Sequence, residues 1–571
     1  MDSPFSHLFG RNEAPSAADI PVVHGMLSEP LEKLGQLDSE IAHLEAVLAN
    51  LRQERDDVQK YVDAHQRLLS PSLRIPSEIL SEIFVRCLPE DRNPVCSASQ
   101  APLLLGLICR SWREVCLSTP RLWTSIHVVL PTSGEITRMC RTVDEKRLGV
   151  EAWLDRSGSL PLSFSIFGSC QLSISSRHAD AEQRRIDLEQ NAKTLSQHVD
   201  QLLRCFTKQT YRWQNVELRL NKYCAKTLEE SMAALADPDW SVASLNSFAF
   251  MLLDSMRPPG QDLTYLPKFL AAPHLRRVTV AVNIQDVLQH LEQSNPNLSQ
   301  LNVSCGGVFL PGLQLPSFFS LLSRYAHLRD CHLDVQVPQT VSLESYPDIS
   351  LPLLRKLSLN FNGEREVSDI DQLLFNKISV PALHSLTLTV SRAWHVIFAH
   401  APFLSWLIDN QIHELNLSLP LSIEAYLECL TLVPNLSRLA IHDRVLTKES
   451  AETLIDRLLP SSERPEPLCP TLQQLSIFGL EVDDELMLNL ARSRRSSIFE
   501  GINSLDILRV RFERYKQLVG IDNMLDELRK QGMEINFEYQ LGRKDEASLG
   551  QHQVTGPFEN SSMSSAYMMY T

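Results

Sequence analysis

The chain has 571 residues, of which 43% are hydrophobic and 22% are charged, so it is long enough for several units that each bury a core. Its formal net charge is −15 and no block of Lys and Arg occurs, which argues against a nucleic-acid partner because such partners require a clustered cationic surface. The sequence shows neither the pattern of a signal peptide nor a long apolar stretch of membrane-spanning length, so we expect an intracellular protein, cytoplasmic or nuclear, without a membrane partner.

Residues 1–25 are rich in Ser, Pro, Ala and polar side chains without periodicity, which predicts a disordered leader. Residues 26–70 are predicted to form a coiled-coil helix. Its seam alternates steps of three and four residues and consists of Leu34, Leu37, Ile41, Leu44, Leu48, Leu51, Arg55, Val58, Val62, His65 and Leu69. Such a seam fits a homodimer. The alternative is a helix that folds back on the rest of the chain or pairs within it.

Residues 71–126 carry two predicted amphipathic helices joined by a Pro-containing loop. Pro76 stands at a helix start, where a missing amide costs nothing, and Ile79, Leu80, Ile83 and Phe84 follow it at helical spacing. After the loop at 90–100, a second helix is predicted to carry Leu103, Leu104, Leu107, Ile108, Trp112 and Val115. We expect Trp112 to pack against the first helix.

This module closely resembles the F-box. The residues that match in order and spacing are Ile75, Pro76, Glu78, Ile79, Leu80, Ile83, Phe84, Cys109, Arg110, Trp112, Arg113, Leu122 and Trp123. With the heptad helix before it and the segment WLDRSG at 153–158 after it, the module is similar to the large F-box family of mushroom-forming fungi. The resemblance implies binding to the Skp-type adaptor of a cullin-RING ubiquitin ligase, although the loop at 90–100 is longer than the family usually carries.

The docking edge of the module is expected to be apolar. From the residues themselves it would consist of Ile75, Pro76, Ile79, Leu80 and Ile83, while Trp112 and Trp123 close the module's own core. A module of about fifty residues buries too little surface to be stable alone, which favours docking over the alternative that all these residues are core. Taken together, the adaptor-binding residues are predicted to be Ile75, Pro76, Ile79, Leu80, Ile83, Phe84, Trp112, Leu122 and Trp123.

Residues 127–541 carry the pattern L-x-x-L-x-L in nine copies, beginning at Leu275, Leu298, Leu328, Leu354, Leu383, Ile412, Leu436, Leu472 and Leu505. Successive copies begin 23 to 36 residues apart, at the upper end of leucine-rich-repeat periods. Weaker copies begin at Trp213 and Leu245, and helical stretches such as 284–293 and 423–432 lie between strands. We therefore expect an α-helical N-terminal part, formed by the coiled-coil helix and the F-box, followed by an irregular α/β leucine-rich-repeat-like solenoid.

Residues that alternate with the leucines should point to the opposite, open face of the strands. That face is either a partner-binding surface or a merely solvated sheet face. Its candidate contacts are Arg277, Asp330, His332, Lys356, Arg438, His442, Phe478 and Arg509, and the alternation also places Asp334, Glu414, Asn416 and Gln474 there. Phe478 is the least expected on a wet surface, which makes it the best single candidate for a contact with a protein substrate.

The sequence gives no sign of catalytic chemistry. It lacks a GxSxG elbow, a phosphate loop, GxGxxG and HExxH, and its twelve cysteines are scattered, so we expect reduced and mostly buried thiols. No catalytic residue, metal or cofactor is predicted, and the tail at 542–571 is predicted to be disordered. These features predict a substrate-recruiting adaptor, with two alternatives: a scaffold that organises a complex without promoting ubiquitination, or an enzyme whose site is assembled from distant residues.

Overall fold

The computed structural model describes residues 3–11, 14–69, 74–170, 181–235, 241–253, 265–282, 287–305, 312–336, 346–362, 375–390, 397–460, 467–495, 501–514, 516–518 and 520–539. The predicted tail at 542–571 lies outside these residues. The chain divides into two units, Met1–Glu82 and Ile83–Thr571. The division falls inside one continuous helix, α2 (Ser77–Arg86).

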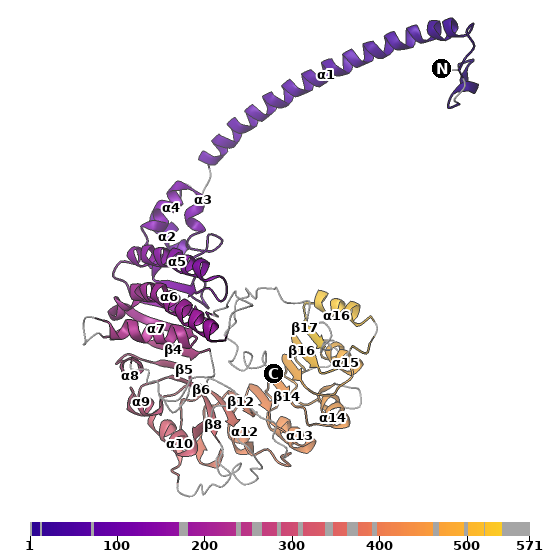
Figure 1. Cartoon of the computed structure of the whole chain (residues 1–571). Helices are drawn as coiled ribbons and strands as arrows, with labels where there is room; N and C mark the ends of the chain where they lie inside the picture. The colour runs from indigo at the N-terminus through magenta and orange to yellow at the C-terminus, as the bar shows by residue number, and fades with distance from the viewer. Residues whose placement is uncertain are drawn as a thin grey trace. The chain divides into compact units, whose positions relative to one another are not determined.

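The first unit is dominated by α1 (Ile20–Leu68), a single helix of 49 residues (Figure 1). Its sequence is dense in Glu, Gln, Arg, Leu and Ala, which lose little side-chain freedom in a helix. The helix begins at Ile20 and η1 (Ser6–Leu8) precedes it, so η1 and the first residues of α1 lie in the segment predicted to be a disordered leader. The predicted long helix is confirmed, but the predicted start at residue 26 is too late, and the helix continues through Pro30.

The second unit is built on one parallel sheet. The strands of its main path lie side by side in chain order. These strands are β1 (Ser125–Val129), β2 (Leu162–Gly168), β3 (Trp213–Leu220), β4 (Ser247–Leu252), β5 (Arg277–Val282), β6 (Gln300–Cys305), β8 (Asp330–Gln336), β10 (Lys356–Asn362), β12 (Ser385–Val390), β13 (Glu414–Ser418), β14 (Arg438–His442), β15 (Gln474–Phe478), β16 (Ile507–Phe512) and β17 (Glu534–Tyr539). Off this path, the short strand β7 (Leu313–Gln314) pairs with β8, and the short strand β9 (Ile349–Ser350) pairs with β11 (Ile378–Ser379).

Helices connect these strands and lie along one side of the sheet (Figure 1). They are α5 (Ile136–Arg156), α6 (Ala181–Thr207), α7 (Lys222–Ala233), α8 (Leu266–Leu270), α9 (Leu288–Gln293), α10 (Leu315–Arg324), α12 (Leu404–Asp409), α13 (Ile423–Leu432), α14 (Lys448–Leu458), α15 (Asp484–Arg495) and α16 (Ile521–Lys530), with the 3-10 turn η4 (Thr210–Arg212) before β3. The predicted helix at 423–432 coincides with α13. Of the predicted helix at 284–293, α9 covers 288–293, and residues 284–286 lie outside the described residues.

The leucine pattern accounts for the core of this sheet. The leading residue of each of the nine copies is at most 1% exposed. The second and third apolar positions of neighbouring copies face each other in register, as Val278 does with Leu301 and Leu475 does with Leu508. Burying these rows on one side of a parallel sheet and covering them with helices removes the apolar face from water. The expected order of strands and helices is thereby confirmed as a parallel α/β sheet.

Candidate functional site

The residues that resemble an F-box fold into a small helical module. It consists of α2, α3 (Leu105–Ile108), α4 (Arg110–Leu117) and the 3-10 turn η3 (Pro120–Trp123). Phe84 of α2 is fully buried and packs on Trp112 of α4, with ring centroids 5.0 Å apart. The indole N–H of Trp123 donates to the carbonyl oxygen of Cys116 at 3.0 Å, and its ring meets Trp153 edge-on at 4.8 Å. The predicted contact of Trp112 with the first helix is therefore confirmed.

The sequence indicated one continuous second helix in this module, but the structure has two. Cys109 is extended (φ −155°, ψ 172°) and separates α3 from α4. Its sulfur accepts the backbone N–H of Trp112 at 3.5 Å, which caps α4, and Arg113 Nε donates to the carbonyl oxygen of Gly106 at 2.8 Å. The apolar spacing alone gave no sign of this break, because it continues on both sides of Cys109. The break leaves three apolar side chains of this region exposed: Leu104, Leu107 and Ile108.

Helix α2 sorts its apolar side chains into two sets. Ile79 and Ile83, one turn apart, are 56% and 43% exposed, whereas Leu80 is only 4% exposed. Leu80 was expected on the docking edge, but in the structure it belongs to the core. An exposed pair of isoleucines beside a buried row is the arrangement that a helix needs in order to meet a partner on one side.

The remaining predicted adaptor-binding residues fall into the same two groups. Ile75 is half-buried and Pro76 is exposed, and both lie just before the first residue of α2. Leu122 and Trp123 are buried, and Trp112 is half-buried. These last three residues, like Phe84, pack in the interior of the module.

The long loop at 90–100 is anchored on the first strands of the sheet. The backbone N–H of His127 donates to the carbonyl oxygen of Pro94 at 2.8 Å, and Asn93 Nδ2 donates to Ser165 Oγ at 3.1 Å. The ring Nδ1 of His127 also lies 2.7 Å from Ser165 Oγ. Burial beneath this loop lowers the pKa of His127. The extra loop residues therefore fasten the segment before α3 to β1 and β2.

The eight candidate contacts of the sheet share its open face. The cross-strand register places Arg277, Asp330, Lys356 and Arg438 in a first row, His332 and Arg509 in a second, and His442 and Phe478 in a third. All four Arg and Lys residues are exposed, and the other four are half-buried. The alternation predicted from the sequence is therefore confirmed for these residues.

Phe478 lies among charged and aromatic side chains. The ring of His442 lies 6.3 Å away on the preceding strand, and the guanidinium of Arg511 lies 5.6 Å above the Phe478 ring. Arg511 donates in turn to Glu538 at 2.9 Å. Arg511 and Glu538 were not singled out from the sequence, although the alternation EINFEY at 534–539 signals one further strand. A half-buried aromatic ring edged by charges is a typical anchor for a protein partner.

The centre of the open face holds a tight polar network. His332 Nδ1 lies 2.7 Å from Ser358 Oγ, while its Nε2 is 3.8 Å from Asp334, too long for a hydrogen bond. Asp334 is only 3% exposed and accepts the backbone N–H of Cys305 at 2.6 Å and Asn360 Nδ2 at 2.9 Å. Asp334 was expected to be open to solvent, so this expectation is wrong. Its donors satisfy the carboxylate, which gives the network a role in holding β6, β8 and β10 together.

The described parts of the chain hold no group of three or more His, Cys, Asp or Glu side chains that is placed to bind a metal ion. The twelve cysteines are free thiols, and the sulfurs of Cys170 and Cys224 lie 3.8 Å apart. No helix among the described residues is both long enough and apolar enough to cross a membrane.

No family model and no curated protein matches the sequence, so we argue the function from the residues and their geometry.

Proposed function

We propose that this chain is an F-box adaptor, the substrate-recognition subunit of an SCF-type cullin-RING ubiquitin ligase. It binds the Skp-type adaptor through the module at 75–123 and holds a protein substrate on the open face of the sheet. The observation that carries the proposal is the division of α2 into exposed Ile79 and Ile83 and buried Leu80 and Phe84. Exposed isoleucines on a packed helix gain most when a partner removes them from water.

The sheet supports the second half of the proposal. Parallel strands in chain order, with connecting helices on one side, fit a leucine-rich-repeat-like solenoid that presents its open face to the substrate. Phe478 with Arg511 and His442 offers the aromatic and cationic side chains that protein interfaces favour. The protein itself carries out no reaction in this proposal.

The test is capture of purified Skp-type adaptor by the full chain. Ile79→Asp with Ile83→Asp should abolish capture, because the change places charges where apolar contacts are made. Ile408→Asp is the matched control, since Ile408 of α12 is 65% exposed and lies outside the module. Failure of the unmodified chain to bind, or unchanged binding by the double variant, would contradict the proposal.

A scaffold that organises a complex without ubiquitination is the second candidate function. The observation in its favour is α1, whose exposed apolar side chains suit assembly as much as substrate transfer. The two functions differ in one respect that can be measured. A ligase subunit retains cullin together with the Skp-type adaptor, whereas a scaffold retains the adaptor alone.

A further inference from the structure

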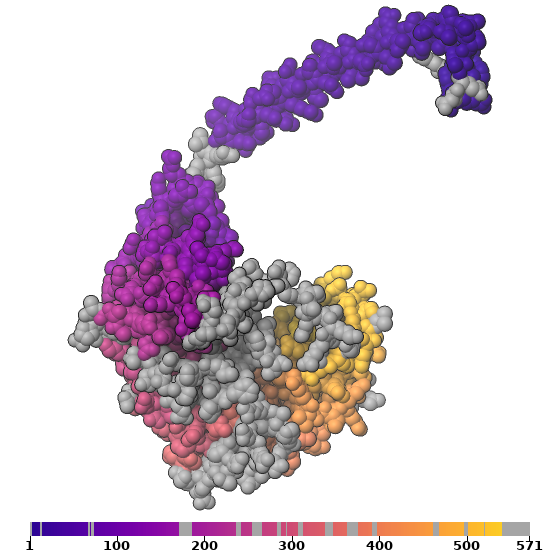
Figure 2. Space-filling model, in the orientation of Figure 1, coloured from indigo at the N-terminus to yellow at the C-terminus, as the bar shows by residue number. Residues whose placement is uncertain are grey.

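Helix α1 carries a continuous apolar seam at its surface. Its aliphatic members from Leu34 to Val62 are between 38% and 58% exposed: Leu34, Leu37, Ile41, Leu44, Leu48, Leu51, Val58 and Val62. Figure 2 shows the side chains of α1 standing at the surface. Isolated helices gain little stability in water, and most helical stability comes from packing an apolar face against a partner. A seam with strict steps of three and four over several heptads specifies that the partner is another helix.

The described part of this chain offers no other helix with a matching free seam. Apart from α1, only α5 and α6 exceed twenty residues there, with 21 and 27 residues. Both have already buried their apolar faces: Val143 and Trp153 of α5 are at most 1% exposed, as are Leu202 and Phe206 of α6. The remaining helices that the structure describes are too short to cover the seam. Since no second helix among the described residues matches α1 in length and spacing, the partner that fits the seam is α1 of a second copy.

The length of the seam is sufficient for a stable pair. From Leu34 to Leu69 it runs for about 50 Å at roughly 1.5 Å per residue, and a helix is about 10 Å across. Two such strips in contact remove on the order of 1,000 Å² of surface from water, which reaches the lower range of specific interfaces. A pair of α1 helices therefore needs no contribution from the second unit of either chain.

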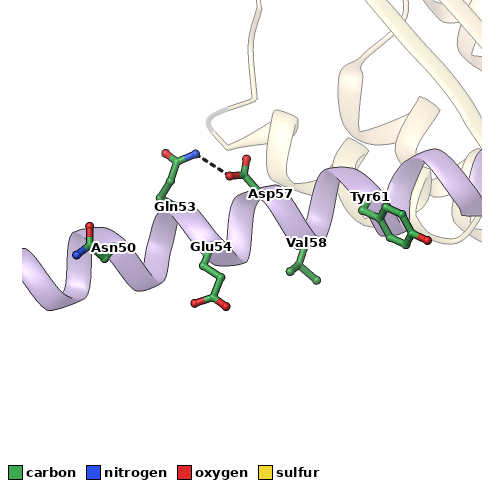
Figure 3. Close-up of a pocket in the computed structure, with 6 residues that line it drawn as sticks. All are labelled: Asn50, Gln53, Glu54, Asp57, Val58 and Tyr61. Atoms are coloured by element: carbon green, nitrogen blue, oxygen red, sulfur yellow. Dashed lines mark hydrogen bonds between the residues drawn. The ribbon is translucent and has the colours of Figure 1, made fainter.

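A shallow hollow lies on α1 beside the seam. It is lined by Asn50, Gln53, Glu54, Asp57, Val58 and Tyr61, all from α1 itself (Figure 3). Gln53 Nε2 donates a hydrogen bond to Asp57 Oδ2 at 3.1 Å, which the dashed line in Figure 3 marks. The hollow is thus part of the helix surface and not an enclosed site. Val58 is the one residue of this lining that also belongs to the seam.

Arg55 is the charged residue of the seam and limits what assembly is possible. Its side chain is 72% exposed and forms an ion pair with the neighbouring Asp56. In a two-stranded coiled coil the long Arg side chain reaches water at the edge of the seam. In a three- or four-stranded bundle the same position is enclosed, and burying an unpaired charge is strongly unfavourable.

We propose that α1 pairs with α1 of a second copy of this chain in a two-stranded coiled coil, and that Arg55 restricts the assembly to two strands. The proposal concerns α1 alone, so it stands or falls independently of adaptor binding by the module at 75–123. Its consequence is that each assembly carries two docking modules and two open sheet faces.

The experiment measures the mass of the full chain by sedimentation velocity across a range of concentrations. The unmodified chain should be a dimer. Leu44→Asp with Leu48→Asp should raise the dimer dissociation constant by at least about a hundredfold, because four buried leucines are lost per dimer. Ala46→Asp is the matched control, since Ala46 lies on the same turn of α1 but outside the seam, and it should leave the dimer intact.

Arg55→Leu tests the second half of the proposal. The variant should bind at least about tenfold more tightly or form species larger than a dimer, because a polar residue in a coiled-coil core trades stability for a defined number of strands. A monomeric unmodified chain, or a dimer that survives both aspartates, overturns the pairing. An unmodified chain that forms trimers or tetramers, or an Arg55→Leu dimer of unchanged affinity and size, overturns the role of Arg55. An unchanged melting temperature of the second unit in the aspartate variants shows that this unit is still folded.

Discussion

Phe84 packs against Trp112 with ring centroids 5.0 Å apart, and this contact joins α2 to α4 in the helical module at 75–123. Phe84→Ala should lower the free energy of unfolding of the module by about 3–5 kcal/mol, because it removes a fully buried ring and leaves a cavity. Urea unfolding followed by tryptophan fluorescence measures the loss. Capture of the Skp-type adaptor should disappear with the fold of the module.

Ile79→Ala is the matched control for Phe84→Ala. Because Ile79 is 56% exposed, its truncation should change the unfolding free energy by no more than about 0.5 kcal/mol. Weakened adaptor capture with unchanged stability is the expected result. A Phe84→Ala variant as stable as the unmodified chain would show that the ring contact contributes little.

Phe478→Glu should abolish substrate capture while leaving the sheet folded. The ring is half-buried beside Arg511, so the loss of stability should be about 1 kcal/mol, the usual size of a partly exposed cation–π contact. Phe512→Glu is the contrasting change, since Phe512 on the neighbouring strand is 1% exposed and its replacement should unfold the C-terminal strands. A collapsed melting temperature for Phe478→Glu would instead assign Phe478 to the core.

Stability should decrease when the pH falls below about 6.5. Burial lowers the pKa of His127, His332 and His442 beneath the ordinary value of 6.5. The unfolded chain keeps the ordinary pKa and therefore binds more protons than the folded chain in this range. The stabilisation is complete above the unfolded pKa and is lost as the pH falls through the lowered values.

The urea midpoint at about pH 7.5 and at about pH 5.5 measures this pH effect. We expect a lower midpoint at the acidic pH, and a smaller difference for His332→Gln, because glutamine keeps a hydrogen-bonding group near Ser358 but does not titrate. A midpoint that rises on acidification would contradict the assignment.

Arg494 should be one of the most sensitive positions of the sheet's C-terminal half. It is 2% exposed, and its guanidinium donates to the carbonyl oxygens of Leu458, Leu468 and Cys469 at 2.9, 2.7 and 3.0 Å. Burial lowers its pKa to about 10, so it stays charged at neutral pH. Arg494→Met should lower the free energy of unfolding by about 3 kcal/mol, because three buried acceptors lose their donor.

Arg494→Lys should recover little of the Arg494→Met loss, because one ammonium group does not reproduce the planar fork of guanidinium donors. The exposed Arg492 on the same helix supplies the control, and Arg492→Met should change stability by less than about 0.5 kcal/mol. Equal stability of the Arg492→Met and Arg494→Met variants would show that the buried hydrogen bonds of Arg494 do not stabilise the fold.

The sequence predicted the strands well because L-x-x-L-x-L reports directly which side of each strand is buried. Strands β2 and β17 were missed because they lack the first leucine of this pattern. Pro161 takes its place before β2 and Gly532 takes its place before β17, although the second and third positions of both strands are apolar as usual. A search for leucines does not detect such strands, whereas their alternation does.

The helical module at 75–123 was less predictable in detail. Spacing on α2 yields two apolar pairs, Ile79 with Ile83 and Leu80 with Phe84, and nothing local tells which pair faces the interior. That choice is made by contacts with distant residues, such as Trp112 against Phe84. Asp334 was misplaced for the same reason, since its donors come from residues 26 and 29 positions away.

The sequential strand order also bears on how the protein is made. Each strand of the main sheet pairs with the strand that precedes it in this sheet. A chain emerging from the ribosome can therefore add one strand at a time to an edge that is already folded. A prematurely ended chain would keep its earlier strands paired but expose a bare parallel edge. Such an edge attracts other chains, so fragments of this protein should aggregate or be degraded more readily than the complete sheet.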